Sequence, residues 1–465
     1  MPPKSDPVLI VGAGVFGLSL AHELAANRGY TSVTILDRFL PPVPDGSSVD
    51  VSRIIRTEYA DPLYSSLATD ALQGWRTSEV YRPHYHESGF VMMADERERP
   101  SPYFEKYRQW KTAHDRERPL EFFEPPHADD EVKRLYRGVQ ADLREFAATH
   151  NRAGGWADAA GAIRTLAGRC TLAGVSFVTG AQGTVVSLLR RRGAGGEERV
   201  TGVRTAAGMT LEAERVVLAT GAWTNRVVPG VGHAVAASAQ PVGFIRLSDD
   251  EAERVRDMPV MVNMSTGVFC FPPTPGTNLL KVARHGFGYA TEFEAEAPTV
   301  ASHGDDGDGN GNGNGEAAGG GMRRTVSSPK LVGSNAASGF LPRDADEGLR
   351  DGVRLFFPEF AEREWVYRRL CWYTDTPEGD FVVDYHPDLE GLFFATGGAG
   401  HAFKFLPVIG THVADCFERK ASTALRDKWR LRRAVGGETT LRMAGDGSRA
   451  GPALRKLSPQ EQAKL

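Results

Sequence analysis

Short apolar runs that end in glycine turns are the clearest pattern along this chain. The first run, Val8–Val11, leads into Gly12-Ala13-Gly14 and then into a segment whose apolar residues recur at helical spacing. A second apolar run, Val33–Leu36, ends at Asp37. Because parallel strands need a crossover connection, usually a helix, this pattern predicts a β-α-β unit of about 30 residues.

The same pattern returns twice later in the chain. A helical segment and short strands precede a buried run that starts at Arg215 and ends in a glycine turn at Gly221. A last apolar run after Gly391 ends in a second glycine turn and leads into a helix near Lys404. Three separated pieces of one sheet predict an α/β fold with a discontinuous, Rossmann-like dinucleotide-binding domain.

The segments between these pieces are expected to form a second domain. Residues 303–321 are almost pure Gly, Asn and Asp, and such a tract buries too little apolar surface to order itself, so we interpret it as a disordered insertion. The polar chain after Ala421 is expected to extend from the body. The predicted division is 7–87, 150–234 and 372–420 for the cofactor domain, 88–149 and 235–371 for the substrate domain, and 421–465 for the tail.

Composition and charge exclude several classes of protein. The chain has 465 residues, of which 25% are charged and 41% hydrophobic, which is typical of a globular protein. The net charge of −4 is spread along the chain without a basic block, which argues against a nucleic-acid partner. No apolar run approaches the roughly 20 residues that cross a bilayer, and the N-terminus lacks the pattern of a secretory signal.

Four widely spaced cysteines form no CxxC pair. This spacing excludes a disulfide scaffold and a cysteine zinc cluster, and it fits a reducing compartment. We expect no bound metal. The last three residues, Ala463-Lys464-Leu465, are a close variant of the peroxisomal Ser-Lys-Leu address, so we expect the peroxisomal import receptor as a partner and the cytoplasm as the alternative location.

The first glycine turn carries a dinucleotide-binding fingerprint. Gly12 permits the tight turn, Gly14 lets the backbone approach a pyrophosphate, and Gly17 allows close packing of helix against strand. The helix N-terminus offers free N–H groups to the phosphates. Asp37 follows Gly17 by 20 residues, where a carboxylate can bind a ribose hydroxyl and disfavours a 2′-phosphate. The residues thus leave NAD and FAD as candidates.

Three further motifs separate these candidates by resemblance. They are Ser47-Ser48 followed by Arg53-Ile54-Ile55-Arg56, the segment around Cys371, and Gly400-His401-Ala402-Phe403-Lys404-Phe405. Together they resemble the family of FAD-dependent amine oxidases that contains monomeric sarcosine oxidase, pipecolate (saccharopine) oxidase and fructosyl amino acid oxidase, with the closest likeness to fungal members. The resemblance extends from Pro7 to about Glu418 and implies an FAD-binding Rossmann-like domain with a substrate domain built on a mixed β-sheet.

The fingerprint and the resemblance together imply a set of cofactor-binding residues. In this family a cysteine in the setting of Cys371 carries the flavin through an 8α-thioether, so the resemblance implies covalent FAD. Without that context, a free cysteine is most often a buried core residue. The residues expected at the cofactor are Gly12, Gly14, Val15, Phe16, Gly17, Asp37, Arg38, Ser48, Arg53, Gly221, Trp223, Cys371, Gly398, Gly400, His401, Phe403 and Lys404.

The resemblance also implies four catalytic residues, Arg56, Lys404, Lys281 and His285. Residues in the positions of Arg56 and Lys404 bind the substrate carboxylate, a task that suits a guanidinium fork. A lysine in the position of Lys281 lies over the flavin and helps oxygen accept electrons through its fixed charge. If the segment is a strand, Lys281 and His285 share one face, and a histidine pKa near neutrality would influence the protonation state of the substrate. Outside this context, such arginines and lysines are usually solvated.

The function expected is oxidation of a secondary or N-alkyl amine, most simply an amino acid, by hydride transfer to flavin N5, with O₂ reduced to H₂O₂. The alternative is a tailoring oxidase that acts on an N-methyl or cyclic amine of fungal secondary metabolism. An NAD-dependent dehydrogenase and an inactive flavoprotein are less consistent with the motifs. Phe269 replaces a tyrosine of the sarcosine enzymes, which puts the amine contacts there in doubt. Sarcosine, L-pipecolate, saccharopine and fructosyl amino acids all stay open as substrates, because the size of the pocket depends on loops that the sequence does not place. The resemblance implies a monomer.

Overall fold

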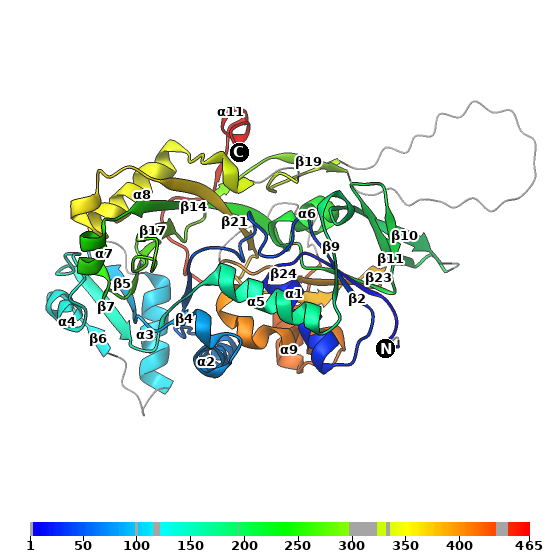
Figure 1. The fold of residues 1–465 in the computed structure, drawn as a ribbon, viewed down its shortest axis with the longest axis horizontal. Helices are drawn as coiled ribbons and strands as arrows, with labels where there is room; N and C mark the ends of the chain where they lie inside the picture. Colours follow the sequence, from blue (N-terminus) through cyan, green and yellow to red (C-terminus); the bar gives the residue numbers. More distant parts are fainter. Residues whose placement is uncertain are drawn as a thin grey trace, which may run out of the picture.

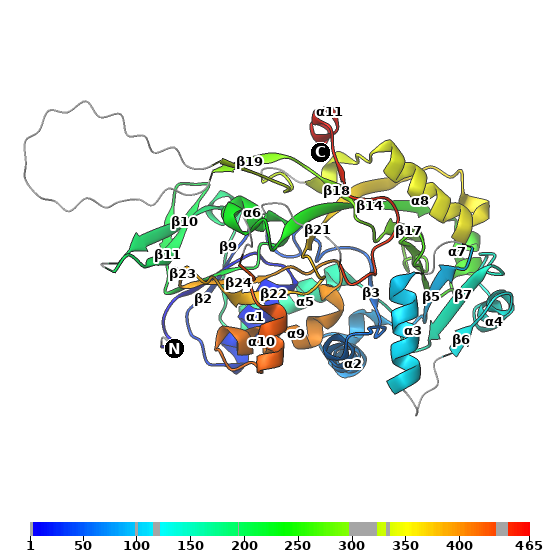
Figure 2. The ribbon, with the colours of Figure 1, turned by 180° about the vertical axis from the view of Figure 1, so that it is seen from behind.

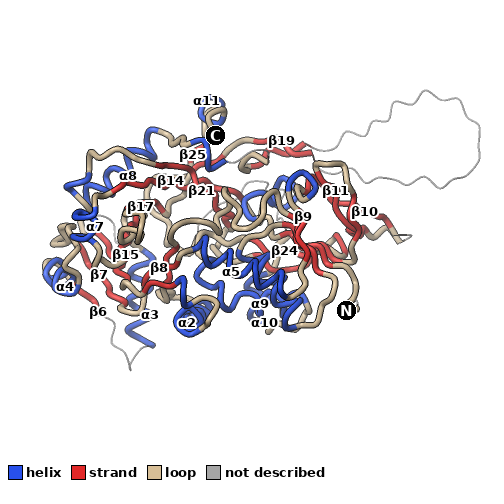
Figure 3. The backbone as a smooth tube through the Cα atoms, in the orientation of Figure 1, coloured by secondary structure: helices blue, strands red, loops and turns tan. Residues whose placement is uncertain are grey.

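The computed structural model describes residues 3–97, 101–114, 121–193, 195–296, 323–331, 335–433 and 445–465. The predicted disordered insertion, residues 303–321, lies outside these ranges. The strands fall into two main groups, one around β24 and β9 and the other around β5, β7 and β15 (Figure 3). Within the described ranges, no helix combines the length and the apolar character that crossing a membrane requires.

The first main sheet has six strands in the order β22-β24-β13-β1-β2-β9. All neighbouring pairs are parallel except β22 with β24 at one edge. The predicted β-α-β unit is present, with its two strands and the helix between them. The bounds are β1 Val8–Val11, α1 Val15–His22, β2 Val33–Leu36, β9 Ser176–Val178, β13 Arg215–Leu218, β22 Val382–Tyr385 and β24 Leu392–Thr396.

Helices cover one face of this sheet, and a smaller sheet covers the other. The helices are α1, α2 (Pro62–Thr77), α5 (Ala159–Leu172) and α9 (Leu406–Phe417), which share an apolar core with the strands (Figure 1). On the opposite face, apolar side chains of β10 (Val185–Arg192) and β11 (Glu198–Thr205) form a second core with the same strands. Strands that are buried on both faces explain the uninterrupted apolar runs of the sequence.

The strands of this sheet come from three separate stretches of the chain, residues 8–36, 176–218 and 382–396. This arrangement is the one that the repeated strand-then-glycine pattern predicts. The domain boundaries themselves stay a prediction.

The second main sheet has ten strands and is mixed. Most neighbouring pairs are antiparallel, whereas β15 with β5 and β18 with β25 are parallel. The strands are β5 Phe90–Asp95, β6 Glu121–Phe123, β7 Phe146–Asn151, β14 Ala236–Arg246, β15 Val260–Asn263, β16 Val268–Cys270, β17 Leu279–Arg284, β18 Tyr289–Ala290, β21 Tyr367–Asp375 and β25 Arg455–Lys456.

One face of the second sheet is covered by helices and the other faces a cavity. The covering helices are α8 (Arg343–Phe356), α7 (Asp249–Val255) and α4 (His127–Leu135), which bury alternate residues of the central strands (Figure 1). Since side chains alternate along a strand, the residues between the buried ones point to the opposite face. On β21, Leu370 and Trp372 lie in the helix-covered core, so Cys371 and Tyr373 point the other way.

Smaller elements complete the fold. The strands β3, β8 and β4 form a three-stranded sheet next to the cavity, and β12 and β23 extend the small sheet of β10 and β11. Strands β19 and β20 form a separate antiparallel two-stranded sheet, and α3 packs near β5. Their bounds are β3 Arg53–Ile55, β4 Tyr85–His86, β8 Gly155–Ala157, β12 Thr210–Glu212, β19 Phe293–Glu296, β20 Arg323–Val326, β23 Leu389–Glu390 and α3 Pro102–His114.

The expectation that the chain after Ala421 extends from the body is wrong for its described parts. Helix α10 (Thr423–Trp429) buries Trp429 completely in the core of the first sheet. Strand β25 pairs with β18, and in Figure 2 the red C-terminal segment runs along the body before it reaches α11 (Pro459–Gln462). Tryptophan and leucine residues spaced among the charged ones provide the apolar contacts that a count of polar residues overlooks.

Candidate functional site

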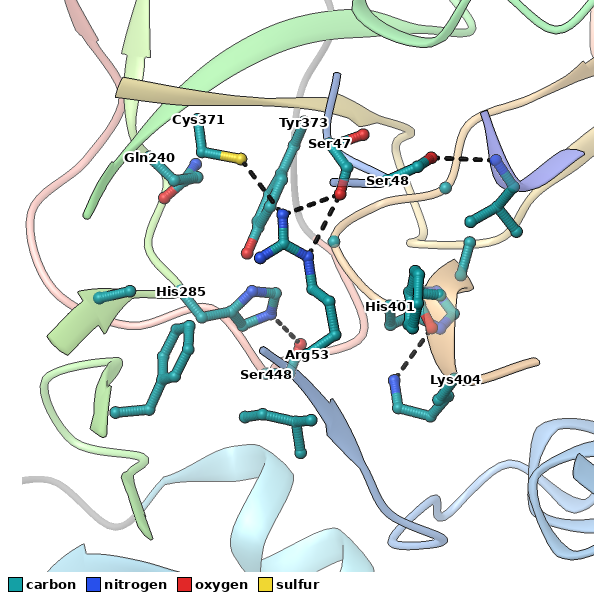
Figure 4. A pocket seen from close by; sticks show the side chains of 18 of the residues that line it. Ser47, Ser48, Arg53, Gln240, His285, Cys371, Tyr373, His401, Lys404 and Ser448 are labelled. Atoms are coloured by element: carbon teal, nitrogen blue, oxygen red, sulfur yellow. Dashed lines mark hydrogen bonds between the residues drawn. The ribbon is translucent and has the colours of Figure 1, made fainter. Parts of the chain in front are cut away.

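A cavity lies where the glycine turns of the first sheet meet the open face of the second sheet. The turns contribute Gly14, Gly221, Gly398 and Gly400, and the loop before β3 contributes Ser48. Figure 4 shows side chains from both sides pointing into this space. The second sheet contributes Gln240 and Val242 from β14, Lys281 and Ala283 from β17, His285 just after it, and Cys371 and Tyr373 from β21.

Strand register explains why these residues of the second sheet meet. On β14, Gln240 pairs with Cys371 of β21, and Val242 pairs with both Arg369 of β21 and Ala283 of β17. Paired residues in neighbouring strands point to the same face of a sheet. The predicted strand face with Lys281, Ala283 and His285 is therefore present, and it lies against the cavity.

A buried carboxylate, Asp50, organises the charged residues of this face. Its Oδ2 lies 2.8 Å from Lys281 Nζ, 2.5 Å from Arg53 Nη1 and 3.4 Å from Arg369 Nη2. Burial works to raise the pKa of Asp50, but the three cations hold it far below its usual value. The carboxylate is therefore charged at neutral pH.

Burial has the opposite effect on Lys281. It lowers the pKa of this lysine to about 8, although Asp50 favours its charged form. Lys281 Nζ also donates a hydrogen bond of 2.8 Å to the Ser52 carbonyl, so the ammonium is held in one position. A lysine fixed in this way can change its charge within the physiological pH range.

Cys371 is buried and lies beside Arg53. Arg53 Nη2 is 3.7 Å from Cys371 Sγ and donates a 2.8 Å hydrogen bond to the Ser47 carbonyl (Figure 4). The guanidinium thus links the loop before β3 to the only cysteine that lines this cavity among the described residues.

Two further cations, Arg56 and Lys404, enter the cavity from the opposite side. Arg56 lies over the rings of Tyr59 and Tyr103, at 4.8 and 5.5 Å from their centroids, and donates a 3.1 Å hydrogen bond to Tyr103 Oη. Lys404 Nζ donates 2.9 Å bonds to Tyr59 Oη and to the His401 carbonyl. Burial and the charge of Arg56 lower the pKa of Lys404 well below its ordinary value.

Within the described residues, neither Arg56 nor Lys404 has a carboxylate within the 4 Å of an ion pair, and all the hydrogen bonds of Lys404 are to neutral oxygens. A buried cation without a counter-ion is costly. An anionic ligand between the two side chains would supply that counter-ion and raise the pKa of Lys404 again.

The expectation of a near-neutral pKa for His285 is wrong. Burial, together with the charges of Arg449 and Arg56, lowers the pKa of this histidine well below its usual value. Its Nε2 lies 3.1 Å from Ser448 Oγ. His285 is therefore a neutral imidazole, which can accept or donate a hydrogen bond but does not carry charge at neutral pH.

A second cavity adjoins the first and surrounds the predicted nucleotide-binding residues. It is lined by Gly12, Asp37, Arg38 and Trp223 together with the end of β10. Asp37 Oδ2 accepts a 2.7 Å hydrogen bond from Ala13 N, and the Arg38 guanidinium lies 4.4 Å from the centre of the Trp223 ring. The residues that line both cavities are Gly14, Ser47, Ser48, Ala219 and Gly221.

This arrangement fits a dinucleotide whose two halves join at the glycine turn. A Cβ on Gly14 would lie 2.9 Å from Ser48 Oγ, so only glycine leaves room for another group there. A Cβ on Gly17 would lie 1.9 Å from the Gly12 carbonyl oxygen, and Gly17 therefore shapes the turn and lines neither cavity. Val15 N donates a 2.9 Å bond to Ser48 Oγ and fixes the loop against the helix N-terminus.

The structure brings the other predicted site residues to these two cavities. The four predicted catalytic residues all line the first one. Within the described ranges, no three His, Cys, Asp or Glu side chains gather so as to hold a metal ion. The predicted cofactor residues at the first cavity are Gly14, Val15, Phe16, Ser48, Arg53, Gly221, Cys371, Gly398, Gly400, His401, Phe403 and Lys404.

Sequence reasoning missed several residues of the site. Asp50 and Arg369 form the buried charge cluster, and Asp446 and Ser448 reach the first cavity from the C-terminal segment. Asp50 lies three residues before Arg53, but outside a helix this spacing does not predict an ion pair. Asp446 gave no local signal, because its place depends on how the last segment packs.

Comparison with known proteins places the chain among flavin enzymes. The profile of the family described as FAD dependent oxidoreductase matches residues 7–416. The chain is 29% identical over 439 residues to L-saccharopine oxidase of Schizosaccharomyces pombe, covering 92% of this chain and 93% of that protein. It is 28% identical over 482 residues to amino acid oxidase imqH of Aspergillus flavus, covering 94% and 99%.

Comparison of the fold with solved structures agrees with this family. The solved structure of fructosyl peptide oxidase from E. terrenum has a TM-score of 0.82 with this chain at 25% identity, and the match covers 98% of this chain and 97% of that one. The resemblance inferred from the motifs and the α/β fold with a parallel sheet and a mixed sheet are confirmed.

The Asp50 cluster yields a prediction about stability. Asp50→Asn leaves three buried cations without their shared carboxylate and should lower the free energy of unfolding by about 3–5 kcal/mol. Adding Lys281→Met should restore part of this loss, because one cation fewer then remains unpaired. The measurement is urea unfolding followed by tryptophan fluorescence.

Glu347→Gln is the matched control, since Glu347 forms an ion pair with Arg343 on the surface, where both side chains are exposed. It should leave the unfolding curve unchanged. A midpoint for Asp50→Asn equal to that of the wild type would show that the cluster does not stabilise the fold.

Proposed function

The chain belongs to the FAD-dependent oxidoreductase family, and we propose that it oxidises a secondary or N-alkyl amino acid to an imine and reduces O₂ to H₂O₂. The coarser activity, FAD-dependent oxidation of an amino acid CH–NH bond, follows from the family and from the relatives that it resembles. The finer assignment depends on the residues of the cavity.

Bound FAD supplies a two-electron acceptor for a hydride and then passes the electrons to oxygen. We propose that the glycine turn at Gly12 and Gly14, with Asp37 and Ser48, holds its nucleotide half. The residues around Cys371 and the turn at Gly398 would hold its flavin half. The two adjoining cavities, which share Gly14 and Ser48, support this assignment.

The observation that carries the proposal is the pair of basic side chains, the half-buried Arg56 and the buried Lys404, which face the cavity with no carboxylate of the described residues within ion-pair distance. A substrate carboxylate would bind between them, and Tyr59 would orient Lys404 through the 2.9 Å hydrogen bond. With the carboxylate fixed, the amine and the carbon beside it are confined to the rest of the cavity. Such orientation is a large part of the rate enhancement of enzymes.

Lys281 is proposed to assist the reaction with oxygen. Its ammonium is buried, held by Asp50 and Ser52, and preorganised to stabilise negative charge that develops on oxygen. His285, which is neutral, is proposed to hold the substrate amine in its uncharged form by hydrogen bonding. An uncharged nitrogen is needed because its lone pair assists loss of hydride from the adjacent carbon.

The tailoring function remains the alternative. A cavity without a carboxylate clamp would favour it, whereas this cavity contains both cations of the clamp. Import into peroxisomes through Ala463-Lys464-Leu465 also stays a proposal. Leu465 packs against the core of the second sheet, and its carbonyl accepts a hydrogen bond from Lys330, so the receptor would have to release it. A monomer remains the expected oligomeric state.

The function is tested by peroxide release from the purified yellow protein in air. The panel contains sarcosine, L-pipecolate, L-saccharopine, L-proline, a fructosyl amino acid and N-methylated amines that lack a carboxylate. We expect turnover of an amino acid, with a kcat/KM that falls about 100-fold or more in Arg56→Ala because a buried ionic contact to the carboxylate is lost.

An amine without a carboxylate serves as the control for Arg56→Ala, since its turnover should not change. Turnover restricted to amines without a carboxylate would instead support the tailoring function. Absence of peroxide with every compound would refute the proposed activity.

The lowered pKa of Lys281 predicts a pH dependence. Its folded pKa of about 8 lies below its ordinary value, so the ammonium is charged below pH 8 and loses its charge as the pH rises through 8. The rate constant for the reaction of the reduced enzyme with O₂ should therefore fall across that range, as measured by stopped flow. Lys281→Met should be about 100- to 1000-fold slower and independent of pH.

Lys281→Arg is the matched variant, because arginine keeps its charge throughout this range and should remove the pH dependence without the large loss of rate. An unchanged rate constant in Lys281→Met would contradict the role of this residue.

Covalent attachment through Cys371 is tested with acid-denatured protein. The wild type should keep its yellow colour in the precipitate, whereas Cys371→Ser should release its flavin into the supernatant. Cys416→Ser, which changes a buried cysteine of α9 away from the cavities, is the control and should behave as the wild type. Release of flavin from the wild-type protein would refute the thioether.

A further inference from the structure

The C-terminal segment brings a carboxylate into the substrate cavity. Asp446 and Ser448 line the cavity together with Arg56 and Lys404, although they follow these residues by more than 40 positions. Arg449 anchors the segment through three contacts. Its guanidinium donates a 2.7 Å hydrogen bond to the Gly286 carbonyl and a 3.2 Å hydrogen bond to the Ala399 carbonyl, and it forms an ion pair with Asp375. The carboxylate is therefore held in place from both sheets.

One oxygen of Asp446 is engaged and the other is open. Oδ1 accepts hydrogen bonds from Ser448 N at 3.0 Å and from Ser448 Oγ at 2.5 Å. In the part of the chain that the structure describes, Asp446 forms no ion pair within 4 Å and Oδ2 has no hydrogen-bond donor. Burial works to raise the pKa of Asp446, but interaction with His401, the hydrogen bonds from Ser448 and the charge on Arg56 hold it below its usual value, so the side chain is ionised at neutral pH.

The cavity thus holds groups of both charge signs that are not in direct contact with each other. Among the described residues, Arg56 and Lys404 have no carboxylate within ion-pair distance and Asp446 has no cation within it, although the three line the same space and their charges act on one another across it. Unpaired buried charges are costly, and a ligand that supplies both partners removes the cost. A carboxylate on the substrate would satisfy the two cations.

The reacting nitrogen cannot be the partner of Asp446. Hydride loss from the adjacent carbon needs a neutral nitrogen with a free lone pair, whereas a carboxylate favours the protonated form of an amine beside it. The cation that pairs with Asp446 must therefore be a different group of the substrate.

We infer that Asp446 binds a second, positively charged group of the substrate, which makes the substrate an amino acid with a carboxylate, an oxidisable secondary amine and an additional ammonium. This inference rests on the proposed function. It assigns a role in substrate specificity to the C-terminal segment that carries Asp446, which lies outside the central strands of both main sheets.

A structural role for Asp446 predicts a different result. Ser448 Oγ donates to Asp446 and must therefore accept the hydrogen of His285 Nε2, which fixes the tautomer of that histidine. If Asp446 acted only through this chain, its loss would affect all substrates alike. If it binds an ammonium, its loss affects only substrates that carry one.

The experiment compares kcat/KM at pH 7.5 for two matched pairs of compounds. The first pair is Nα-methyl-L-lysine and its Nε-acetyl derivative, and the second is Nε-methyl-L-lysine and its Nα-acetyl derivative. Acetylation removes the additional ammonium and leaves the secondary amine and the carboxylate unchanged, while the two pairs place the ammonium at different distances from the carboxylate.

In the wild type we expect a preference of about tenfold or more for the cationic member of at least one pair, because a buried charge contact is gained. Asp446→Asn should abolish this preference. Asp446→Glu, which keeps the charge, should retain it. Ser448→Ala, which breaks the chain to His285 but keeps the carboxylate, should lower the two members of a pair by the same factor. Flavin content of each variant confirms that the site is intact.

A wild type without preference in either pair, or a preference that survives in Asp446→Asn, would overturn the inference. So would an enzyme that is active on other amino acids and turns over none of these four compounds. Absence of peroxide with every amine tested would instead refute the proposed function itself.

Discussion

The arrangement of the cavity depends on the carboxylate of Asp50. This side chain lies in the loop before β3, yet its partners come from β17, β21 and β3. A buried carboxylate is stable only where cations and hydrogen bonds replace its water. The loop can therefore take its native path only when both strands of the second sheet are in place. One ion cluster thus fixes Lys281 and the candidate attachment cysteine relative to the loop that carries Ser47 and Ser48.

The cluster also determines the electrostatic character of the site. Asp50 offsets one charge of the three cations around it, and Arg56 adds another on the opposite wall, where Lys404 gains its charge once an anionic ligand raises its pKa. In a space with little water, such an excess of positive charge favours anionic ligands and negative charge that develops during a reaction. Asp446 is the exception, because it introduces negative charge at one place in an otherwise positive cavity. Selection among amines can therefore rest on where the substrate carries each charge.

The sequence predicted the first sheet well, because its signals are local. The bounds of β1 and β2 agree with the apolar runs that predicted them, and the strand that carries Lys281 has the expected face. Its predictions for the C-terminal segment and for the pKa of His285 were wrong. Both depend on burial by distant elements, since Trp429 packs into the first core and His285 is enclosed next to Arg449. Polarity along the chain does not contain that information.

The sequence by itself determined the nucleotide fold, the family and the residue types of the chemistry. These follow from short-range patterns, such as glycines that permit a turn and apolar runs that require burial on both faces. Only the tertiary structure decided which charges are paired. Asp50 acquires three cations, whereas Arg56, Lys404 and Asp446 have no partner of opposite charge within ion-pair distance among the described residues. Pairing depends on distances of a few ångströms between segments hundreds of residues apart, and it is set by strand register and by the anchoring of the last segment.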